Sequence, residues 1–132
     1  DPGMITQMQE KFIRKGNAIR EKLQTMHVVN TFGNEGPVIM TYGSTTMAVV
    51  EALRFSGQKG RVVQPIYLEP FPEWAMGCHA DEKPIVVEQS STGLFAQLVE
   101  DRLGVGPEAV IKKYDGRPFD PEELALSLKE VL

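Results

Sequence analysis

The stretch PIVVEQSSTGLFAQLVEDRLG, residues 84–104, decides the fold. It begins with PIVVEQ, residues 84–89, whose apolar run at 84–87 is typical of a strand that is buried on both faces. After a short loop of serine, threonine and glycine, apolar residues recur at helical spacing, which predicts a helix that ends at Gly104. The inner side of this helix is expected to carry Leu94, Phe95, Leu98, Val99 and Leu103. The stretch is therefore one strand–loop–helix unit.

The same order of strand and helix recurs on both sides of this unit. Strands are expected at residues 38–42 (VIMTY), 61–68 (RVVQPIYL) and 108–114 (EAVIKKY), and helices at 44–57, from Pro72 onward, and at 120–132. Pro65 removes one ladder donor from the second of these strands. Helix-length connections between successive strands favour a parallel sheet with helices on both faces. The prediction is an α/β domain of three layers, helix–sheet–helix, around a mostly parallel sheet with four identified strands.

The N-terminal part has a different pattern. Apolar residues at three- and four-residue steps predict an amphipathic helix from Met4 to about Leu23, with basic residues on the opposite face: Lys11, Arg14, Lys15, Arg20 and Lys22. We favour a linker or docking helix with a solvated basic face over a helix lying on a membrane. The turn-rich NTFGNEGP, residues 30–37, follows. We therefore predict a basic linker helix and boundary at 1–33 and the α/β domain at 34–132. A first residue of Asp1 rather than methionine is typical of a fragment or a processed chain.

Composition limits the possible function classes. The 132 residues carry a formal net charge of -4, which gives no general reason to expect a nucleic-acid or anionic-membrane partner. With Cys78 as the single cysteine, an internal disulfide and a cysteine-held cluster within this chain are both excluded. No apolar run is long enough to span a bilayer, and no signal peptide is visible. A cytoplasmic setting is the expectation.

Candidate binding residues lie where strands end. In a parallel sheet the loops after the strands gather at one edge, and the following helices point their amino ends toward it. The expected edge residues are Gly43, Ser44, Thr45, Glu88, Ser91, Thr92 and Gly93. Their hydroxyl and N–H groups could hold an anion, although capping of the helices is the favoured interpretation. Hydrogen bonding to a nearby loop is favoured over proton transfer for Glu88. The cluster at Cys78, His79, Asp81 and Glu82 is interpreted as a helix end rather than a metal or catalytic site.

The stretch KYDGRPFDPEEL, residues 113–124, combines a turn with a helix start. Asp120 is the expected N-cap, Pro121 suits the first helical position, and Glu123 lies where a capping box places its acid. Helix capping does not explain the polar turn before it, which consists of Tyr114, Asp115, Gly116 and Arg117. A guanidinium there is suited to a carboxylate of a partner subunit or of the turn itself.

Several of these motifs together resemble a known family. YGST, EAL, YLEPFP, VVEQSSTGLFAQL and KKYDGRPFDPEEL occur in the order and spacing of the carboxyl-terminal domain of the alpha subunit of 2-oxoacid:ferredoxin oxidoreductases. KYDGRPFDPEEL is more similar to the 2-oxoglutarate type than to the pyruvate type. Where family members commonly have a tyrosine and a glutamine around the TG pair, this chain has Ser91 and Leu94. The resemblance implies a transketolase carboxyl-terminal-like fold with a mixed five-stranded sheet, so that one edge strand comes from a stretch interpreted as loop.

The resemblance also implies a place in a larger enzyme. The complex would oxidatively decarboxylate a 2-oxoacid, form an acyl-coenzyme A and reduce ferredoxin, using thiamine diphosphate, magnesium and an iron–sulfur cluster. The implied partners are the other domain of the alpha subunit, a thiamine-binding beta subunit and, as a further candidate, a gamma subunit. The sequence lacks a Gly-Asp-Gly motif with paired asparagines for the cofactor, so we expect a non-catalytic assembly domain. The alternatives are a stand-alone anion-binding α/β module, or the equivalent domain of a transketolase or a 2-oxoacid dehydrogenase beta subunit.

Overall fold

A five-stranded mixed sheet forms the centre of the molecule. The computed structural model describes residues 18–132 except 20, 23, 91–92, 114–116 and 118. Its strands are β1 (Val29–Phe32), β2 (Val38–Met40), β3 (Arg61–Pro65), β4 (Ile85–Glu88) and β5 (Ala109–Lys112), in the order β1-β3-β2-β4-β5. β1 pairs antiparallel with β3, and the other three pairings are parallel. The predicted α/β class is confirmed.

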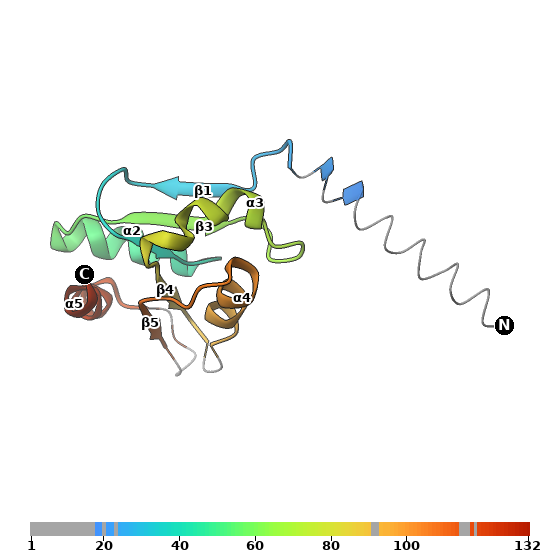
Figure 1. Ribbon diagram of the computed structural model, residues 1–132. Coiled ribbons are helices and arrows are strands. Elements are labelled where there is room, and N and C mark those ends of the chain that lie inside the picture. The colour runs from blue at the N-terminus through green and yellow to red at the C-terminus, as the bar shows by residue number, and fades with distance from the viewer. Residues whose placement is uncertain (1–17, 20, 23, 91–92, 114–116, 118) are drawn as a thin grey trace, which may run out of the picture.

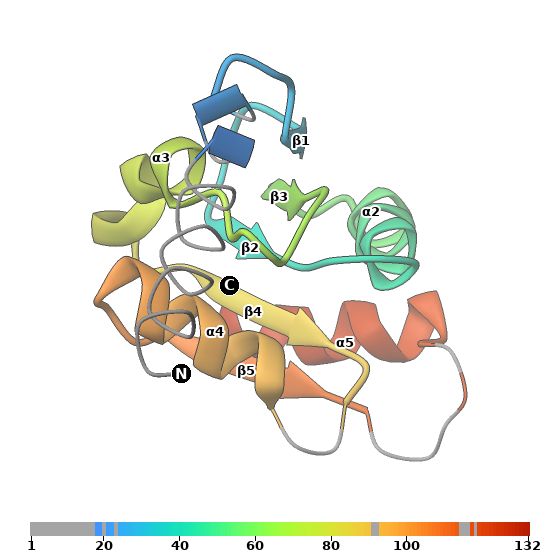
Figure 2. The ribbon, with the colours of Figure 1, turned by 90° about the vertical axis from the view of Figure 1, so that its right-hand side faces the viewer.

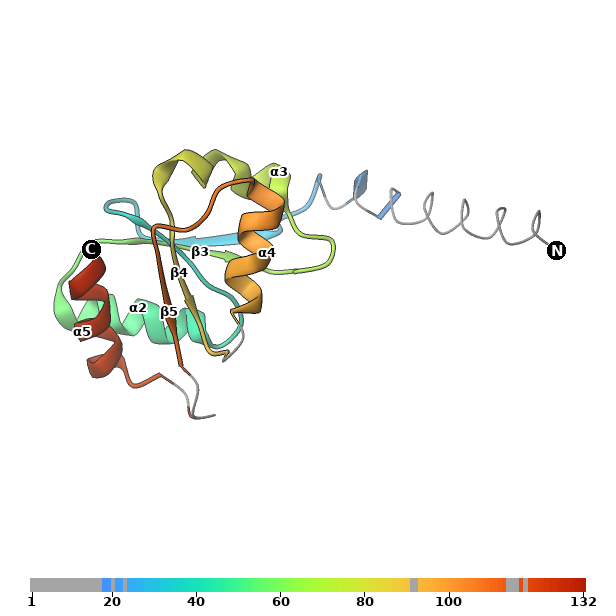
Figure 3. The same cartoon turned by 60° about the horizontal axis from the view of Figure 1, so that its bottom comes forward.

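The helices cover both faces of this sheet (Figures 1 and 2). They are α2 (Thr45–Ser56), α3 (Glu73–Met76), the 3-10 helix η1 (Gly77–Glu82), α4 (Leu94–Leu103) and α5 (Pro121–Val131). α2 and α5 pack on one face, and α3 and α4 pack on the other, as Figure 3 shows from below. The expected three layers are therefore present.

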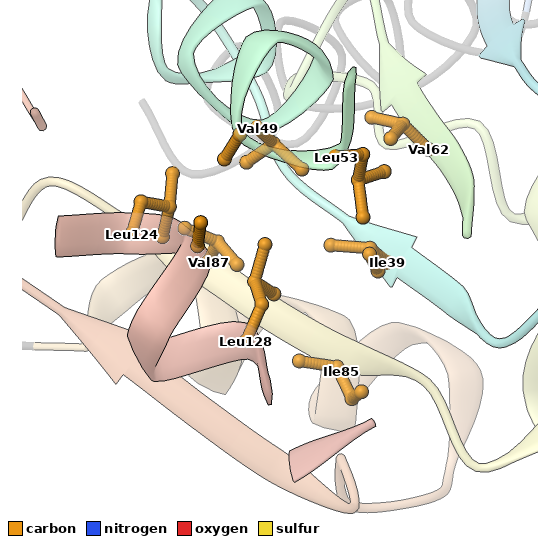
Figure 4. Close-up of a cluster of buried hydrophobic side chains, with 10 residues drawn as sticks. Ile39, Val49, Leu53, Val62, Ile85, Val87, Leu124 and Leu128 are labelled. Carbon is orange, nitrogen blue, oxygen red and sulfur yellow. The ribbon is translucent and has the colours of Figure 1, made fainter. Parts of the chain in front are cut away.

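Each face of the sheet has its own apolar core. Side chains alternate along a strand, so Ile39 of β2 points to the α2 and α5 face while Val38 and Met40 point to the opposite face. Figure 4 shows the first core, in which leucines of α5 and side chains of α2 meet Ile39, Val62, Ile85 and Val87 of the sheet. The central strands β2 and β4 are covered on both sides, which explains their apolar runs at residues 38–40 and 85–87.

The strand β1 corrects the interpretation of residues 30–37 as a boundary loop. Asn30–Phe32 belong to β1, which is paired with β3 and lies inside the range predicted as linker and boundary. The main chain is tied to the sheet even earlier, because the Val28 carbonyl accepts a hydrogen bond from the Ile66 N–H at 2.8 Å. The edge strand that the resemblance required thus comes from a stretch interpreted as loop.

The predicted helix from Met4 to about Leu23 lies largely outside the described residues. Of its apolar stripe, the described Ile19 is half exposed. Within the part of the chain that the structure describes, no helix has the length and apolar character needed to cross a membrane.

Candidate functional site

The loops that follow β2, β3, β4 and β5 gather at one side of the sheet, which we call the carboxyl edge. The chain leaves β2 toward the α2 face and leaves β4 toward the α4 face, although the two strands are neighbours. In open α/β sheets, such a change of direction is where ligands and partners commonly bind. The loop with Gly43, Ser44 and Thr45 and the loop with Gly93 follow these two neighbouring strands, and Glu88 is the last residue of β4.

Side-chain contacts join these loops to one another. The Gln64 amide donates to the Gly43 carbonyl at 3.4 Å, linking β3 to the loop after β2. The rings of Tyr42 and Phe95 lie 4.8 Å apart between centroids, which links that loop to the start of α4. A third contact connects the loops after β4 and β5, where the Gln89 amide donates to the Arg117 carbonyl at 2.7 Å. The edge is thus a connected surface rather than a set of separate loops.

Glu88 is the buried polar centre of this edge. Its side chain is 0% exposed, and its Oε2 accepts a hydrogen bond from the Ala96 N–H at 2.6 Å. Burial raises the pKa of the Glu88 carboxyl, while the Ala96 N–H, Lys112 and the Phe95 N–H partly offset that rise. Its other oxygen, Oε1, has no hydrogen-bond partner among the described residues. The Glu88 carboxyl thus accepts a hydrogen bond from the first turn of α4, whereas the sequence predicted a bond to a nearby loop.

Glu88 takes the place of a missing helix cap. The N-cap of α4 is Gly93, which has a φ of 70° and no side chain to offer, so an N–H group of the first turn needs another acceptor. The Glu88 carboxyl supplies it from the adjacent strand. An external anion at this helix start would compete with a carboxyl group that is already there. This contact argues against an anion site at the α4 side of the loops that follow β2 and β4. Thr92, which was a candidate for that site, lies outside the described residues.

The start of α2 differs from the prediction of simple capping. Ser44 is exposed and makes no side-chain hydrogen bond to the helix, so the capping role assigned to it is wrong. The turn is closed instead by the main chain, where the Thr46 N–H donates to the Gly43 carbonyl at 3.2 Å. Thr45 is buried, and the Thr41 and Thr46 hydroxyls are buried without a partner in the described part of the chain.

Two residues of the cluster near Cys78, His79 and Glu82, take part in ion-pair contacts at the side of the sheet opposite the carboxyl edge. The Glu82 carboxylate binds the Arg61 guanidinium at the start of β3 and lies 3.2 Å from His79 Nδ1. The hydrogen bond from Arg61 is the main reason that the pKa of Glu82 is lowered, with His79 adding to it. No group of three histidine, cysteine or acidic side chains in the described ranges could hold a metal ion. The interpretation of GCHADE as a helix end is confirmed, since η1 occupies it.

The KYDGRPFDPEEL stretch is only partly described, because Tyr114, Asp115 and Gly116 lie outside the described residues. The N-cap prediction is confirmed: Asp120 Oδ1 accepts from the Glu122 N–H at 3.1 Å, and Pro121 begins α5. The Glu123 carboxylate lies 3.7 Å from Nζ of Lys113, the residue that follows β5. Arg117 is exposed, and its carbonyl accepts the hydrogen bond from the Gln89 amide.

The carboxyl edge carries exposed apolar side chains that the sequence did not predict. Leu94 was expected inside, but 69% of it is exposed because it starts α4, one residue before the buried Phe95. Other large side chains exposed at this edge are Met47 in the first turn of α2, and Ile66 and Tyr67 after β3. We call Met47, Ile66, Tyr67 and Leu94 the edge patch.

Comparison with known sequences points to one enzyme class. No protein-family model matches the chain. It is 32% identical to subunit alpha of 2-oxoacid:ferredoxin oxidoreductase 2 from Aeropyrum pernix, an alignment that covers 100% of this chain and 22% of that protein. It is 27% identical to the 2-oxoacid:ferredoxin oxidoreductase subunit alpha of Saccharolobus solfataricus, covering 95% and 21%. The chain therefore spans about a fifth of the length of these curated relatives.

Comparison with solved structures points to the same enzyme class. A 2-oxoglutarate:ferredoxin oxidoreductase from Magnetococcus marinus, with 2-oxoglutarate, coenzyme A and succinyl-CoA bound, matches with a TM-score of 0.79 and 27% identity over 98% of this chain and 23% of that one. Two more distant structures show the fold alone. They are a split-gene transketolase in an inactive beta4 tetramer (TM-score 0.59, 20% identity, 79% and 41% covered) and the alpha chain of a probable 2-oxoacid ferredoxin oxidoreductase from Thermoplasma acidophilum (0.52, 22%, 79% and 96%). The expected transketolase carboxyl-terminal-like fold is confirmed.

Proposed function

Because this chain is a homologue of the alpha subunits of 2-oxoacid:ferredoxin oxidoreductases and has the transketolase carboxyl-terminal-like fold, we propose that it is an assembly domain of such a subunit without a catalytic centre of its own. The observation that carries this proposal is the extent of the match. Nearly the whole chain aligns with about a fifth of proteins that are several times longer. The chain therefore corresponds to one part of a larger enzyme.

On this proposal the whole complex oxidatively decarboxylates a 2-oxoacid, joins the acyl group to coenzyme A and passes the electrons to ferredoxin. 2-Oxoglutarate is the favoured substrate. Two things support it: the KYDGRPFDPEEL stretch and the 2-oxoglutarate and succinyl-CoA bound in the similar structure from Magnetococcus marinus. Co-purification of the chain from its native cells tests both parts. We expect a thiamine-binding beta subunit to accompany it and the complex to reduce ferredoxin faster with 2-oxoglutarate than with pyruvate. Isolation of a complex that prefers pyruvate would overturn the substrate, and isolation without other subunits would overturn the role.

Thiamine diphosphate, magnesium and the iron–sulfur cluster belong to other parts of the complex on this proposal. The described residues do not fit these groups, because they contain no cluster of metal-ligating side chains and the single thiol, Cys78, is on the surface. Calorimetric titration of the chain with thiamine diphosphate and magnesium should give no saturable heat. Tight binding in that titration would place the cofactor in this domain and refute the assignment.

The carboxyl edge is the surface that we assign to neighbouring parts of the enzyme. It combines the edge patch with the loops that contain Gly43, Ser44 and Gly93 and with the exposed residue Arg117. In the assembled enzyme, Leu94→Ser and Tyr67→Ser should each weaken association of the subunits. Val110→Ser is the matched control, because Val110 is an exposed apolar residue in the middle of β5, away from these loops. Equal effects of all three substitutions would argue against the edge.

A further inference from the structure

The antiparallel strand β1 brings the chain that enters it to the carboxyl edge. Because β1 runs opposite to β3, its first residues lie beside the end of β3 (Figure 1), with Val29 opposite Pro65 and Asn30 opposite Gln64. His27 lies two residues before β1 and is exposed. The entry of the chain into the sheet and the loop that follows β2 are therefore at the same end of the sheet.

Three side-chain hydrogen bonds cross this end of the sheet. His27 Nε2 lies 2.7 Å from Asn30 Oδ1. Asn30 Nδ2 donates to Gln64 Oε1 at 3.2 Å, and Gln64 Nε2 donates to the Gly43 carbonyl at 3.4 Å. The bonds connect the entry of the chain with the loop at residues 41–46. We call His27, Asn30, Gln64 and Gly43 the edge relay.

The hydrogen bonds of the edge relay can run in only one direction. A main-chain carbonyl only accepts, so Gln64 must present Nε2 to Gly43 and Oε1 to Asn30. Asn30 must then donate through Nδ2 and accept through Oδ1, which requires a hydrogen on Nε2 of the His27 ring. Every donor therefore points from the entry of the chain toward the loop, and reversing one amide breaks the bond to the next residue.

The loop at residues 41–46 has little other polar support. Among the described residues, no side chain other than Gln64 hydrogen-bonds the loop, and the Thr41 and Thr46 hydroxyls are buried without a partner. The Gly43 carbonyl also accepts the Thr46 N–H at 3.2 Å. Gln64 thus binds the same oxygen atom that closes the turn at the start of α2, so its loss should loosen that turn.

We infer that Asn30 and Gln64 are positioning residues, which fix the Gly43 carbonyl through the edge relay and couple the loop after β2 to the chain that enters β1 at His27. The role of this coupling rests on the proposed function, because that function assigns the carboxyl edge to neighbouring parts of the enzyme. A movement of the chain at His27 would then alter the loop that those neighbours contact. The coupling itself belongs to this chain and is measurable without them.

Two substitutions in the full chain test the coupling. Asn30→Asp keeps an acceptor for His27 but has no donor for Gln64, so the Gln64 amide should turn toward residue 30 and release the Gly43 carbonyl. Amide hydrogen exchange at Thr46 should then become about fivefold faster, which corresponds to the loss of one hydrogen bond. Gln64→Met adds no charge and should give the same increase. The double variant should exchange no faster than Gln64→Met alone, because Asn30 acts through Gln64.

A control and a measurement on wild type complete the test. Asn34→Asp adds the same charge beyond the other end of β1 and should leave the exchange of Thr46 unchanged. In wild type, the nitrogen chemical shifts of the neutral His27 ring should show the hydrogen on Nε2. A hydrogen on Nδ1 would overturn the inference. So would unchanged Thr46 exchange in Asn30→Asp, or effects of the two substitutions that add in the double variant.

Subunit association of the assembled enzyme separates this inference from the proposed function. Asn30→Asp should weaken association, because the loosened loop lies at the carboxyl edge. Faster Thr46 exchange with unchanged association would support the coupling and count against the carboxyl edge as the contact surface. Weaker association with unchanged Thr46 exchange would overturn the coupling and leave the carboxyl edge in place.

Discussion

At the scale of single residues, Glu88 has the most unusual environment. A carboxyl group whose folded pKa is raised above its usual value of 4.5 stabilises the fold most when it is protonated. That stabilisation is fully present below the pKa of the unfolded chain and is lost as pH rises through the folded pKa. A neutral amide of the same shape cannot titrate, so it removes this dependence.

We therefore expect the free energy of unfolding of wild type, measured relative to Glu88→Gln, to fall as pH is raised from about 4 toward neutrality. Urea unfolding of both proteins across that range measures the difference. Glu82→Gln is the instructive comparison, because the pKa of Glu82 is lowered and its contribution should change in the opposite direction: present above the unfolded pKa and lost on acidification. A wild-type advantage over Glu88→Gln that grows with pH would contradict the assigned direction.

Arg117 provides a second prediction at this scale, because its main chain and side chain have different roles. Its carbonyl accepts the Gln89 amide, and a substitution of the side chain leaves that carbonyl in place. Because Arg117 is an exposed residue, Arg117→Ala should change the free energy of unfolding by no more than about 0.5 kcal/mol, as is usual for surface substitutions. Gln89→Ala removes the hydrogen bond to that carbonyl and should cost about 1 kcal/mol. Denaturant unfolding compares the two. In the assembled enzyme Arg117→Ala should still weaken association if the guanidinium contacts a partner, and a large stability loss with normal assembly would refute that role.

At the scale of elements, the turn that joins β1 to β2 depends on close approach of main chains. Gly33 has a φ of 90°, and a Cβ added to it would lie 2.5 Å from the Gly60 carbonyl oxygen. Gly57 also has a positive φ, of 70°, but open space around it. Gly33→Ala should therefore cost about 3 kcal/mol or more, and Gly57→Ala only about 1 kcal/mol from backbone strain. Thermal unfolding of the pair separates steric overlap from strain, and equal losses would show that strain alone matters.

The elements also show what the sequence could predict and what it could not. β2 and β4 were recognisable because burial on both faces gives each of them a short apolar run. α5 was recognisable because Asp120 and Pro121 form its start locally. β1 was missed because it is a four-residue edge strand, only partly buried, and is defined by pairing with β3 about thirty residues later. Local composition cannot report such a distant partner.

The same distinction applies to the candidate site. The position of Glu88 and of the two loops followed from strand order, which sequence periodicity predicts well. The exposure of Leu94 could not be predicted in this way. Its spacing matches the buried apolar residues of α4, but it is the first residue of the helix and remains exposed there. The role of Ser44 was predicted wrongly for a related reason: residue type favours a cap, while the backbone conformation decides whether the hydroxyl can reach one.

At the scale of the whole molecule, the division of the chain at residue 33 remains a prediction that truncation can test. Removal of residues 1–23 should leave a cooperatively folded protein, because the first main-chain contact described for the sheet begins at Val28. Removal of residues 1–33 should cost several kcal/mol, since it deletes β1 and uncovers the edge of β3. Unfolding of both truncated forms followed by circular dichroism gives the comparison. Equal stability of the two would confine the domain to 34–132, and collapse of the first would make the basic helix part of the core.

The strand order has a consequence for how the chain is made. A ribosome releases β1 well before β3, so the first strand emerges without its partner. β2 has neighbours on both sides only after β4 has also been synthesised, and the core under α5 closes last, when residues 121–131 leave the exit tunnel. Nascent chains stalled before β4 would therefore hold exposed valine-rich strands with unpaired edges. Such intermediates expose apolar strands that the folded domain buries, so they are the forms of this polypeptide most prone to aggregate.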